Sequence, residues 1–560
     1  MAYFLRQIKR KNDVYLCVYE TYRDKDKKNV VNKYVKSFGS IEKLKSDKIQ
    51  DPLTHFKKEV EKMNVEFNKK RNENKLKHIK DSPLRYLGYF PVFKILSKLN
   101  VKKIIDILQL SSSFRFNVFE ILSALIASRI VMPSSKLKTY NEVFKCLYKS
   151  PEISYDQILE CIDFLGNNYE KIIEAFNRYV FNKYTLSSEK TYFDCTNFFF
   201  EIDKEDNLRR KGPSKENRKS PIVSMGLLLD SNCIPIAMKI FAGNESEKPI
   251  LREIIKELKK INNINGKTIR VADKGLNCAE NILDAYKNKD GYIFSKSVKM
   301  LSEKEIIWLK SENDWREKYD EDGNLIYKYK SCIDDFPYLF TTENGKKIKM
   351  EITEKRVLTY NYSLAKKQKY EILKMAEKAK GLCYCKAKKS EYGESSKYVN
   401  FIGENEEKAR AVIDEEKIKR DLDFSGYNLI VTSEIKMSSK EIYETYHKLW
   451  RIEESFKVMK SELDARPIYL QKEERIKGHL LICYLCVLLL RILQFKELNN
   501  KYSTSQLMKF MKDFKVVKDE NKIINIMQQS ALVSQLRLDL DEPITNLYLT
   551  EKEVKKMLCL

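Results

Sequence analysis

The segment TYFDCTNFFFE, residues 191–201, sets an acid, Asp194, in the middle of an aromatic run. This composition predicts a buried β-strand, in which Asp194 shares one face with Tyr192 and Thr196 because successive side chains alternate. A carboxylate in such a strand is costly to bury unless a positive charge compensates it. Asp194 therefore needs either a buried cationic side chain or a metal ion as its partner, and we favour a metal ion.

A second acid, Asp273, closes the strand-like segment KTIRVAD, residues 267–273. Lys274 and Gly275 follow, so Asp273 stands where a strand ends and a helix begins. Ligands of α/β sheets gather at the carboxyl ends of strands. An Asp at this position is also a common residue at the start of a helix, so both interpretations stay open.

The third acid lies on a predicted helix, KEIYETYHKLWRIEESFKVMKSEL, residues 440–463. At 100° per residue, Glu453 falls within the apolar face of this helix and its neighbour Glu454 falls toward solvent. Tyr446 and Lys460 flank Glu453 on the same side. A structural Glu453–Lys460 pair is the alternative, although two helical turns separate them. We predict that Glu453 is the third acid of the site.

Three carboxylates on a sheet and its packed helix could hold two divalent ions roughly 4 Å apart. Such ions activate a water or a 3′-hydroxyl and stabilise the leaving oxygen. Oxygen ligands suit Mg²⁺ or Mn²⁺, and the four His of the chain form no zinc-like cluster. We therefore predict a two-ion Mg²⁺ or Mn²⁺ site, with phosphodiester chemistry, at Asp194, Asp273 and Glu453.

A strongly basic segment, DNLRRKGPSKENRKS, residues 206–220, follows the strand that carries Asp194. A basic loop beside a metal site would suit contacts with DNA phosphates. A merely solvated loop is the alternative. The candidate DNA-binding residues of this loop are Arg209, Arg210, Lys211, Lys215 and Arg218.

The charge of the whole chain fits a polyanionic partner, since 105 Lys and Arg against 80 Asp and Glu leave a formal charge of +25. A basic enzyme of another kind is equally consistent with this excess. The twelve Cys are scattered and the first residues show no signal-peptide pattern, so we expect a cytoplasmic, nucleoid-associated protein. The apolar run at 480–490 is too short to span a bilayer, so we expect a buried helix and no membrane partner.

From residue 191 the pattern predicts three consecutive strands and then alternating helix and strand. This is typical of an α/β fold with a mixed sheet, for which we expect five strands with helices on its faces. Residues 300–424 interrupt that core with hairpin signals at Asp322-Gly323 and Asn344-Gly345. They predict a β-rich insertion, after which the core resumes.

The chain as a whole divides into segments of different pattern. The helical segment ahead of the core could bind DNA or could simply pack as a scaffold. We expect an antiparallel β module at 1–45, a charged helical linker at 46–85, a helical domain at 86–190, the catalytic core at 191–299 and 425–465, the insertion at 300–424 and a C-terminal helical region at 466–560.

The order of the three acids resembles the catalytic triad of DDE transposases from prokaryotic insertion sequences, and most closely the insertion-sequence-four superfamily. That superfamily carries Tyr-x2-Arg-x3-Glu-x6-Lys on the helix of its third acid. Tyr446, Glu453 and Lys460 match this spacing, and Leu449 replaces the Arg. A subgroup is further similar in its GxSKE and RPIY motifs, found in this chain at 212–216 and 466–469.

The resemblance implies an RNase H-like core and an enzyme that cuts the ends of an element and joins the freed 3′-hydroxyls to target DNA. It implies Mg²⁺, terminal inverted repeats and target DNA as partners, and a homodimer on DNA. Tyr446 and Lys460 become DNA-binding candidates, and Trp450 could stack on a displaced base or pack on the core. Two alternatives are a nuclease with the same core that does not join strands, and a DNA-binding relative without catalysis.

Overall fold

The computed structural model describes residues 2–10, 13–23, 30–75, 84–110, 112–215, 219–261, 266–341, 345–384, 389–402, 410–519 and 522–560. The chain forms two compact units, Met1–Ser82 and Pro83–Leu560. Each unit has a hydrophobic core of its own.

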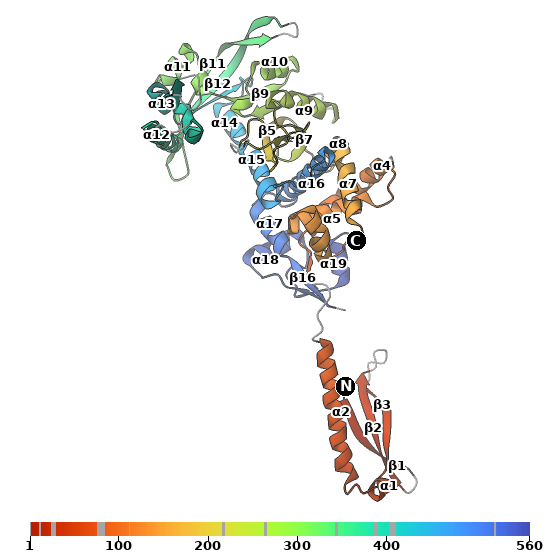
Figure 1. Ribbon diagram of the computed structural model, residues 1–560. Coiled ribbons are helices and arrows are strands. Elements are labelled where there is room, and N and C mark those ends of the chain that lie inside the picture. The colour runs from red at the N-terminus through yellow and green to blue at the C-terminus, as the bar shows by residue number, and fades with distance from the viewer. Residues whose placement is uncertain are drawn as a thin grey trace. The chain divides into compact units, whose positions relative to one another are not determined.

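The first unit is a three-stranded antiparallel sheet with two helices (Figure 1). Its elements are β1 (Ala2–Arg10), β2 (Asp13–Arg23), β3 (Val30–Ser40), α1 (Ile41–Ser46) and α2 (Pro52–Lys75).

Helix α2 falls in the segment 46–85 that the sequence pattern predicts as a linker, but it packs on the sheet. The Asn64 side chain accepts a hydrogen bond from the Tyr3 amide at 2.7 Å and donates one to the Tyr3 carbonyl at 2.9 Å. The ring of Phe56 stacks on Phe38 with centroids 4.1 Å apart. As far as Lys75, this segment therefore belongs to the N-terminal module.

The second unit is built on a nine-stranded mixed sheet in the order β10-β11-β12-β15-β9-β8-β5-β6-β7. β5 runs parallel to β8, and β8 parallel to β9, whereas β6 and β7 are antiparallel to their neighbours. The α/β class predicted from the sequence is confirmed. The strands are β5 (Lys190–Phe199), β6 (Ile222–Leu229), β7 (Pro235–Ala242), β8 (Ile269–Ala272), β9 (Gly291–Lys296), β10 (Arg316–Tyr319), β11 (Leu325–Thr341), β12 (Lys347–Tyr360) and β15 (Tyr427–Thr432).

The sheet has more strands than the five predicted from the sequence. The five expected strands, β5 to β9, are contiguous in the sheet, but β15 pairs antiparallel with β9, and β12 with β15. β11 and β10 then extend the sheet further. The segment 300–424 thus adds three strands to the core sheet, because the free edge of each strand offers backbone groups that the next strand satisfies.

The two faces of β5 pack against different helices. Phe193 lies in a core cluster with α9 (Glu247–Ile261). Tyr192 lies in the cluster that includes α15 (Trp450–Lys457). Asp194 has the same parity as Tyr192, so it faces the side of the sheet on which α15 packs.

The rest of the insertion combines helices with a small hairpin. The turn at Asp322-Gly323 is confirmed, since Gly323 has φ +80° between β10 and β11. Gly345 has φ +74° just before β12, while Asn344 lies outside the described residues. The remaining α-helices and strands of the insertion are α11 (Glu303–Lys310), α12 (Tyr362–Tyr384), β13 (Val399–Ile402), β14 (Arg410–Ile413) and α13 (Glu415–Asp423).

Helices before and after the core sheet pack together, with α16 (Glu473–Ile492) against α5 and α7. Glycines allow this close crossing: a Cβ on Gly478 would stand 2.2 Å from the Ile162 carbonyl oxygen, and one on Gly166 would stand 1.7 Å from that of Glu474. The other main helices are α3 (Phe90–Lys98), α4 (Val101–Gln109), α5 (Val118–Val131), α7 (Tyr155–Asn167), α8 (Tyr169–Tyr184), α17 (Thr504–Asp513), α18 (Ala531–Leu540) and α19 (Glu551–Met557).

The C-terminal region, expected to be helical, also contains strands. β16 (Lys515–Asp519), β17 (Lys522–Asn525) and β18 (Tyr548–Leu549) form a sheet with β4 (Leu84–Tyr86). The order is β18-β17-β16-β4, so the start and the end of the second unit meet in one sheet.

Helix α16, with its continuation to Glu497, is long and apolar enough to cross a membrane by length and composition. In the part of the chain that the structure describes, 94% of its most apolar window is buried inside the protein. Its side chains contact other helices of the unit, so α16 is a core helix, as the sequence predicts.

Candidate active site

Asp194 and Asp273 lie on neighbouring parallel strands. Phe193 of β5 is opposite Ala272 of β8. Asp194 follows Phe193 within β5, and Asp273 is the first residue after β8. The Asp194 side chain is 19% exposed. Asp273 precedes a short 3₁₀ turn, but its side chain makes no capping hydrogen bond to it. The alternative of a purely helix-starting Asp273 is therefore not supported by the geometry.

The predicted single helix of residues 440–463 is interrupted. It begins as α14 (Ser439–His447), tightens into i→i+3 hydrogen bonds around Lys448, and continues as α15. The capping box of Ser438 and Glu441 is present at its start. A helical-wheel projection assumes 100° per residue throughout. The tight turn rotates the backbone further per residue, so the projection misplaces the residues of α15 relative to Tyr446.

The sequence pattern predicted that Glu453 is on the buried face of the helix and that Glu454 points to solvent, and this prediction was wrong. Glu453 is exposed. Glu454 is the more buried acid and pairs with Arg451 at 3.0 Å and with the buried Arg491 at 3.3 Å. Burial opposes the ionisation of Glu454, but Arg491 and Arg451 together outweigh it and lower the pKa of that carboxyl. Glu454 is thus a structural ion-pair residue, and Glu453 remains available for the site.

Glu453 lies within the electrostatic field of the other two acids. Although Glu453 is exposed, partial desolvation of its carboxyl on the site side and the charges of Asp194 and Asp273 together raise its pKa above the ordinary carboxyl value. Burial raises the pKa of Asp194, and Asp273 adds to the shift. The charged forms of Asp194 and Glu453 are therefore destabilised by neighbouring carboxylates, which is the behaviour of groups that converge on a place for a cation.

Lys215 supplies a positive charge at this place. Its Nζ lies 3.2 Å from Asp194 Oδ1 and also donates to the Cys195 carbonyl oxygen. The Lys215 amide donates to Asn197 Oδ1 at 3.1 Å, which fixes the loop on β5. Gly212 permits this path, because a Cβ there would stand 2.0 Å from the Gly243 carbonyl oxygen.

A further acid, Glu247, lies at the same place and was missed by the sequence analysis. Its Oε1 is 3.9 Å from Lys215 Nζ. Burial raises the pKa of Glu247, and Asp194 adds to the shift. Glu247 is in the first turn of α9, where an acid is favoured by the helix dipole alone. For that reason no sequence signal distinguishes Glu247 from an ordinary first-turn glutamate.

The other DNA-binding candidates of the loop differ in their contacts and in their exposure to solvent. Arg209 is engaged within the protein, since it pairs with Asp206 at 2.6 Å and lies over the Phe200 ring. Arg210 is half-buried and Lys211 is exposed. Arg218 lies outside the described residues.

The residues of the helix motif also differ in position. The Tyr446 hydroxyl donates to Asp273 Oδ1 at 3.1 Å, and burial, with Asp273, raises the pKa of Tyr446. Lys460 Nζ lies 5.6 Å from the centroid of the Phe198 ring on β5. Trp450 is 50% exposed, with the Arg451 guanidinium 3.9 Å from its ring centroid.

The fit of these residues to a metal follows from their chemistry. Asp194, Asp273 and Glu453 provide the hard oxygen ligands that Mg²⁺ and Mn²⁺ prefer. Among the described residues, no three acids, His or Cys stand in ready-made ligand geometry. Lys215 and Tyr446 already hydrogen-bond two of the carboxylates. The donor set fits a divalent ion, provided that Lys215 gives way at Asp194.

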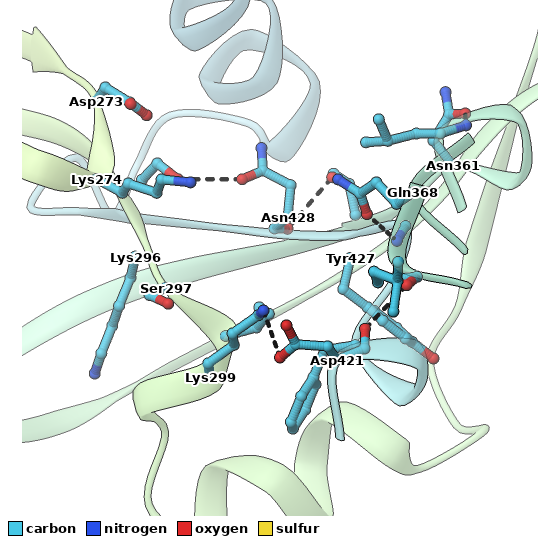
Figure 2. Close-up of a pocket in the computed structure, with 18 of the residues that line it drawn as sticks. Asp273, Lys274, Lys296, Ser297, Lys299, Asn361, Gln368, Asp421, Tyr427 and Asn428 are labelled. Atoms are coloured by element: carbon cyan, nitrogen blue, oxygen red, sulfur yellow. Dashed lines mark hydrogen bonds and ion pairs between the residues drawn. The ribbon is translucent and has the colours of Figure 1, made fainter. Parts of the chain in front are cut away.

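A cavity of about 430 Å³, lined by polar and apolar side chains, adjoins Asp273. Figure 2 shows Asp273 and Lys274 at one end of it and Asn361 and Gln368 at the other. The cavity lies between the core sheet, α14 and the insertion, and Asn428 of β15 projects into it. The insertion therefore helps to form the surroundings of the second acid.

A sequence model of a known family, described as Transposase DDE domain, matches residues 199–490, more than half of the chain. The chain belongs to the DDE transposase family. Membership implies an enzyme that cleaves DNA and transfers strands, and that works with divalent metals. The matched region contains Asp273 and Glu453 and begins after Asp194.

A cryo-EM structure of a piggyBac transposase synaptic complex with hairpin DNA is similar to this DDE transposase at 12% identity. The similarity covers 86% of this chain and 85% of that chain, with a TM-score of 0.34. Among curated proteins, none matches the chain significantly.

Asp194→Asn is expected to raise the melting temperature in the absence of divalent ions. Burial raises the pKa of Asp194 in the folded protein, so the folded state binds more protons than the unfolded state and stability falls as the pH rises through this window. The amide removes that cost. The gain, measured by scanning calorimetry, should be largest at neutral pH and disappear below the ordinary pKa of an aspartate.

Addition of Mn²⁺ provides the matching control for this variant. Mn²⁺ at about 100 times its dissociation constant should stabilise the wild-type protein by about 2.7 kcal/mol. It should stabilise Asp194→Asn much less. Equal stabilisation of both proteins would exclude Asp194 as a ligand.

Proposed function

We propose that this DDE transposase cleaves the ends of an insertion sequence and joins the freed 3′-hydroxyls to target DNA. The observation that carries the proposal is the position of Asp194 and Asp273 on paired parallel strands, with Glu453 in the field of both. We assign these three acids as the catalytic residues and metal ligands. The strand order β7-β6-β5-β8-β9, with β5, β8 and β9 parallel, supports an RNase H-like core.

The finer family assignment rests on the motif of α14 and α15. Tyr446, Glu453 and Lys460 follow the spacing of the insertion-sequence-four superfamily, and we propose that the chain belongs with it. Leu449 replaces the Arg of that motif and is buried. Arg451 cannot replace it, because Arg451 pairs with Glu454.

Two divalent ions, Mg²⁺ or Mn²⁺, would be held by Asp194, Asp273 and Glu453. When bound, they would supply an activated water or 3′-hydroxyl and stabilise the leaving oxygen. Two side chains of the protein position and neutralise these carboxylates before an ion binds. The Tyr446 hydroxyl orients the Asp273 carboxylate, and Lys215 offsets the charge of Asp194 until a cation takes its position.

For partners we propose the terminal inverted repeats of the element, target DNA and a second copy of the chain on DNA, within the cytoplasm at the nucleoid. The formal charge of +25 supports a DNA partner. Lys211 and Trp450 are exposed, and they are our first choices for DNA contacts. Lys215 is exposed too, but it already pairs with Asp194. Arg209 is a weaker candidate because Asp206 already binds it.

The test uses duplexes that contain the presumed element ends, taken from the DNA that flanks the gene. The purified protein should nick them in Mg²⁺ and transfer the 3′-ends to a supercoiled plasmid. Pre-cut ends with a free 3′-hydroxyl separate the proposal from the nuclease alternative, since only a transposase joins them. Binding without either reaction would support a relative that has lost catalysis.

Tyr446→Phe distinguishes a positioning role from a DNA contact. The hydroxyl donates to Asp273, and a hydrogen bond to a charged group contributes about 1.5–3 kcal/mol. The variant should therefore lower the cleavage rate by roughly tenfold or more without changing the affinity for the end duplex. A comparable loss of affinity, measured by fluorescence anisotropy, would instead assign Tyr446 to DNA binding.

A further inference from the structure

The N-terminal unit presents two different faces on its three-stranded sheet. One face packs on the helices, where Leu16 forms a core with Leu44 and Phe56 and where Phe38 stacks on Phe56. Leu5 of β1 packs on this core as well. Because side chains alternate along a strand, the residues adjacent to these point to the opposite face.

The opposite face carries a row of aromatic rings across all three strands. Phe4 of β1 is opposite Tyr19 of β2, and Tyr19 is opposite Tyr34 of β3. The ring centroids of Phe4 and Tyr19 are 6.0 Å apart, and those of Tyr19 and Tyr34 are 5.8 Å apart. Tyr34 is 53% exposed. Phe4 and Tyr19 are half-buried, and none of the three rings belongs to the core cluster of the unit.

Two arginines of β1 lie among these rings. The Arg6 guanidinium is 5.5 Å from the centroid of Tyr19, and the Arg10 guanidinium is 5.9 Å from that of Tyr15. Both arginines are exposed. The face therefore alternates planar rings with cations that are held over them.

The charged residues of the strands divide between the two faces. Lys9 has the parity of Leu5, and Lys33 and Lys36 are opposite Glu20 and Val18, so these lysines and Glu20 belong to the helix-covered face. Arg6 and Arg10 have the parity of Phe4 and belong to the aromatic face, where Asp13 is opposite Arg10. The aromatic face thus combines apolar rings with two arginines and one acid.

We propose that this face binds an unpaired strand of DNA. Rings on a flat sheet stack well on bases that are free of a duplex, whereas paired bases are covered by their own neighbours. Arg6 and Arg10 would contact the phosphates of the strand. The proposal rests on the proposed function for its choice of DNA, and it gives the N-terminal unit a role apart from the three acids.

The experiment measures binding of the full-length chain to a fluorescent thymidine oligonucleotide and to a duplex of equal length. Tyr34→Ala and Tyr19→Ala should weaken binding of the single strand by about tenfold or more, because each base stacked on a ring contributes about 1–3 kcal/mol. Tyr34→Phe and Tyr19→Phe keep the ring and should bind as the wild type. Affinity for the duplex should change little in all four variants.

The arginines are tested by salt dependence. The pair Arg6→Gln and Arg10→Gln should reduce the slope of log affinity against log salt by roughly 0.7 for each phosphate that is no longer neutralised. The matched control is the pair Lys57→Gln and Lys58→Gln on α2, which removes the same charge from exposed positions. If both pairs of substitutions reduce the slope equally, the arginines act only through the overall charge of the protein, and the proposal is overturned.

Other outcomes also overturn the proposal. Unchanged binding in Tyr34→Ala, whose exposed position makes misfolding a poor explanation, would exclude stacking. A change in sedimentation mass in that variant would identify the face as an interface between copies. The proposed function fails separately: Asp194→Asn should lose cleavage yet bind the oligonucleotide normally, and Tyr34→Ala should still nick end duplexes at saturating protein.

Discussion

Asp273→Asn, Asp194→Asn and Glu453→Gln are each expected to reduce both nicking and strand transfer by about a thousandfold or more. Each carboxylate would hold a divalent ion that provides several kcal/mol of charge stabilisation in the transition state. The amides keep the size of the side chains, so the sheet and α15 should stay intact. Rates are measured in single turnover with the end duplex and, separately, with pre-cut ends.

Glu444→Gln on α14 is the matched control for these variants, because Glu444 is exposed on the same helical segment. It should leave both reactions unchanged. Affinity of the three acid variants for the end duplex should equal that of the wild type or exceed it, since a negative charge near the phosphates is removed. Retention of cleavage in any one variant would exclude that acid from the site.

Asp290→Ala is expected to destabilise the second unit by about 3–5 kcal/mol, because it leaves a buried charge uncompensated. The Asp290 carboxylate is fully buried and accepts hydrogen bonds from Arg270 Nη2 at 2.7 Å and from the Thr268 amide at 3.1 Å. It also pairs with Lys259. Arg270 is on β8, so cleavage should fall as well, because β8 positions Asp273.

Urea denaturation and the melting temperature measure this effect. Asp334→Ala is the control, since Asp334 pairs with Lys304 at 2.9 Å where both side chains are exposed, and such pairs contribute little. A wild-type denaturation midpoint for Asp290→Ala would contradict the account of β8. Arg270 keeps a second partner in Asp284, at 2.6 Å, and a small decrease in stability would show that this second ion pair suffices.

Sequence reasoning succeeded where local pattern and backbone geometry act together. The strands that carry Asp194 and Asp273 were predictable, because apolar runs bounded by loops fold as buried strands in any tertiary context. It failed at the Glu453–Glu454 pair. An ideal helical wheel assumes an unbroken helix, whereas the structure tightens the backbone near Lys448, and the buried Arg491 draws Glu454 inward.

The sequence by itself determined the α/β class, the order of the three acids, the basic character of the chain and the hairpin at Asp322-Gly323. These features depend only on residue type and on spacing along the chain, so they can be inferred from the sequence alone. Only the tertiary structure decided that the insertion extends the core sheet to nine strands, and that Lys215 and Glu247 meet at Asp194. Those contacts join residues far apart in sequence, and long-range pairing of strand edges and charges leaves no local pattern in a single chain.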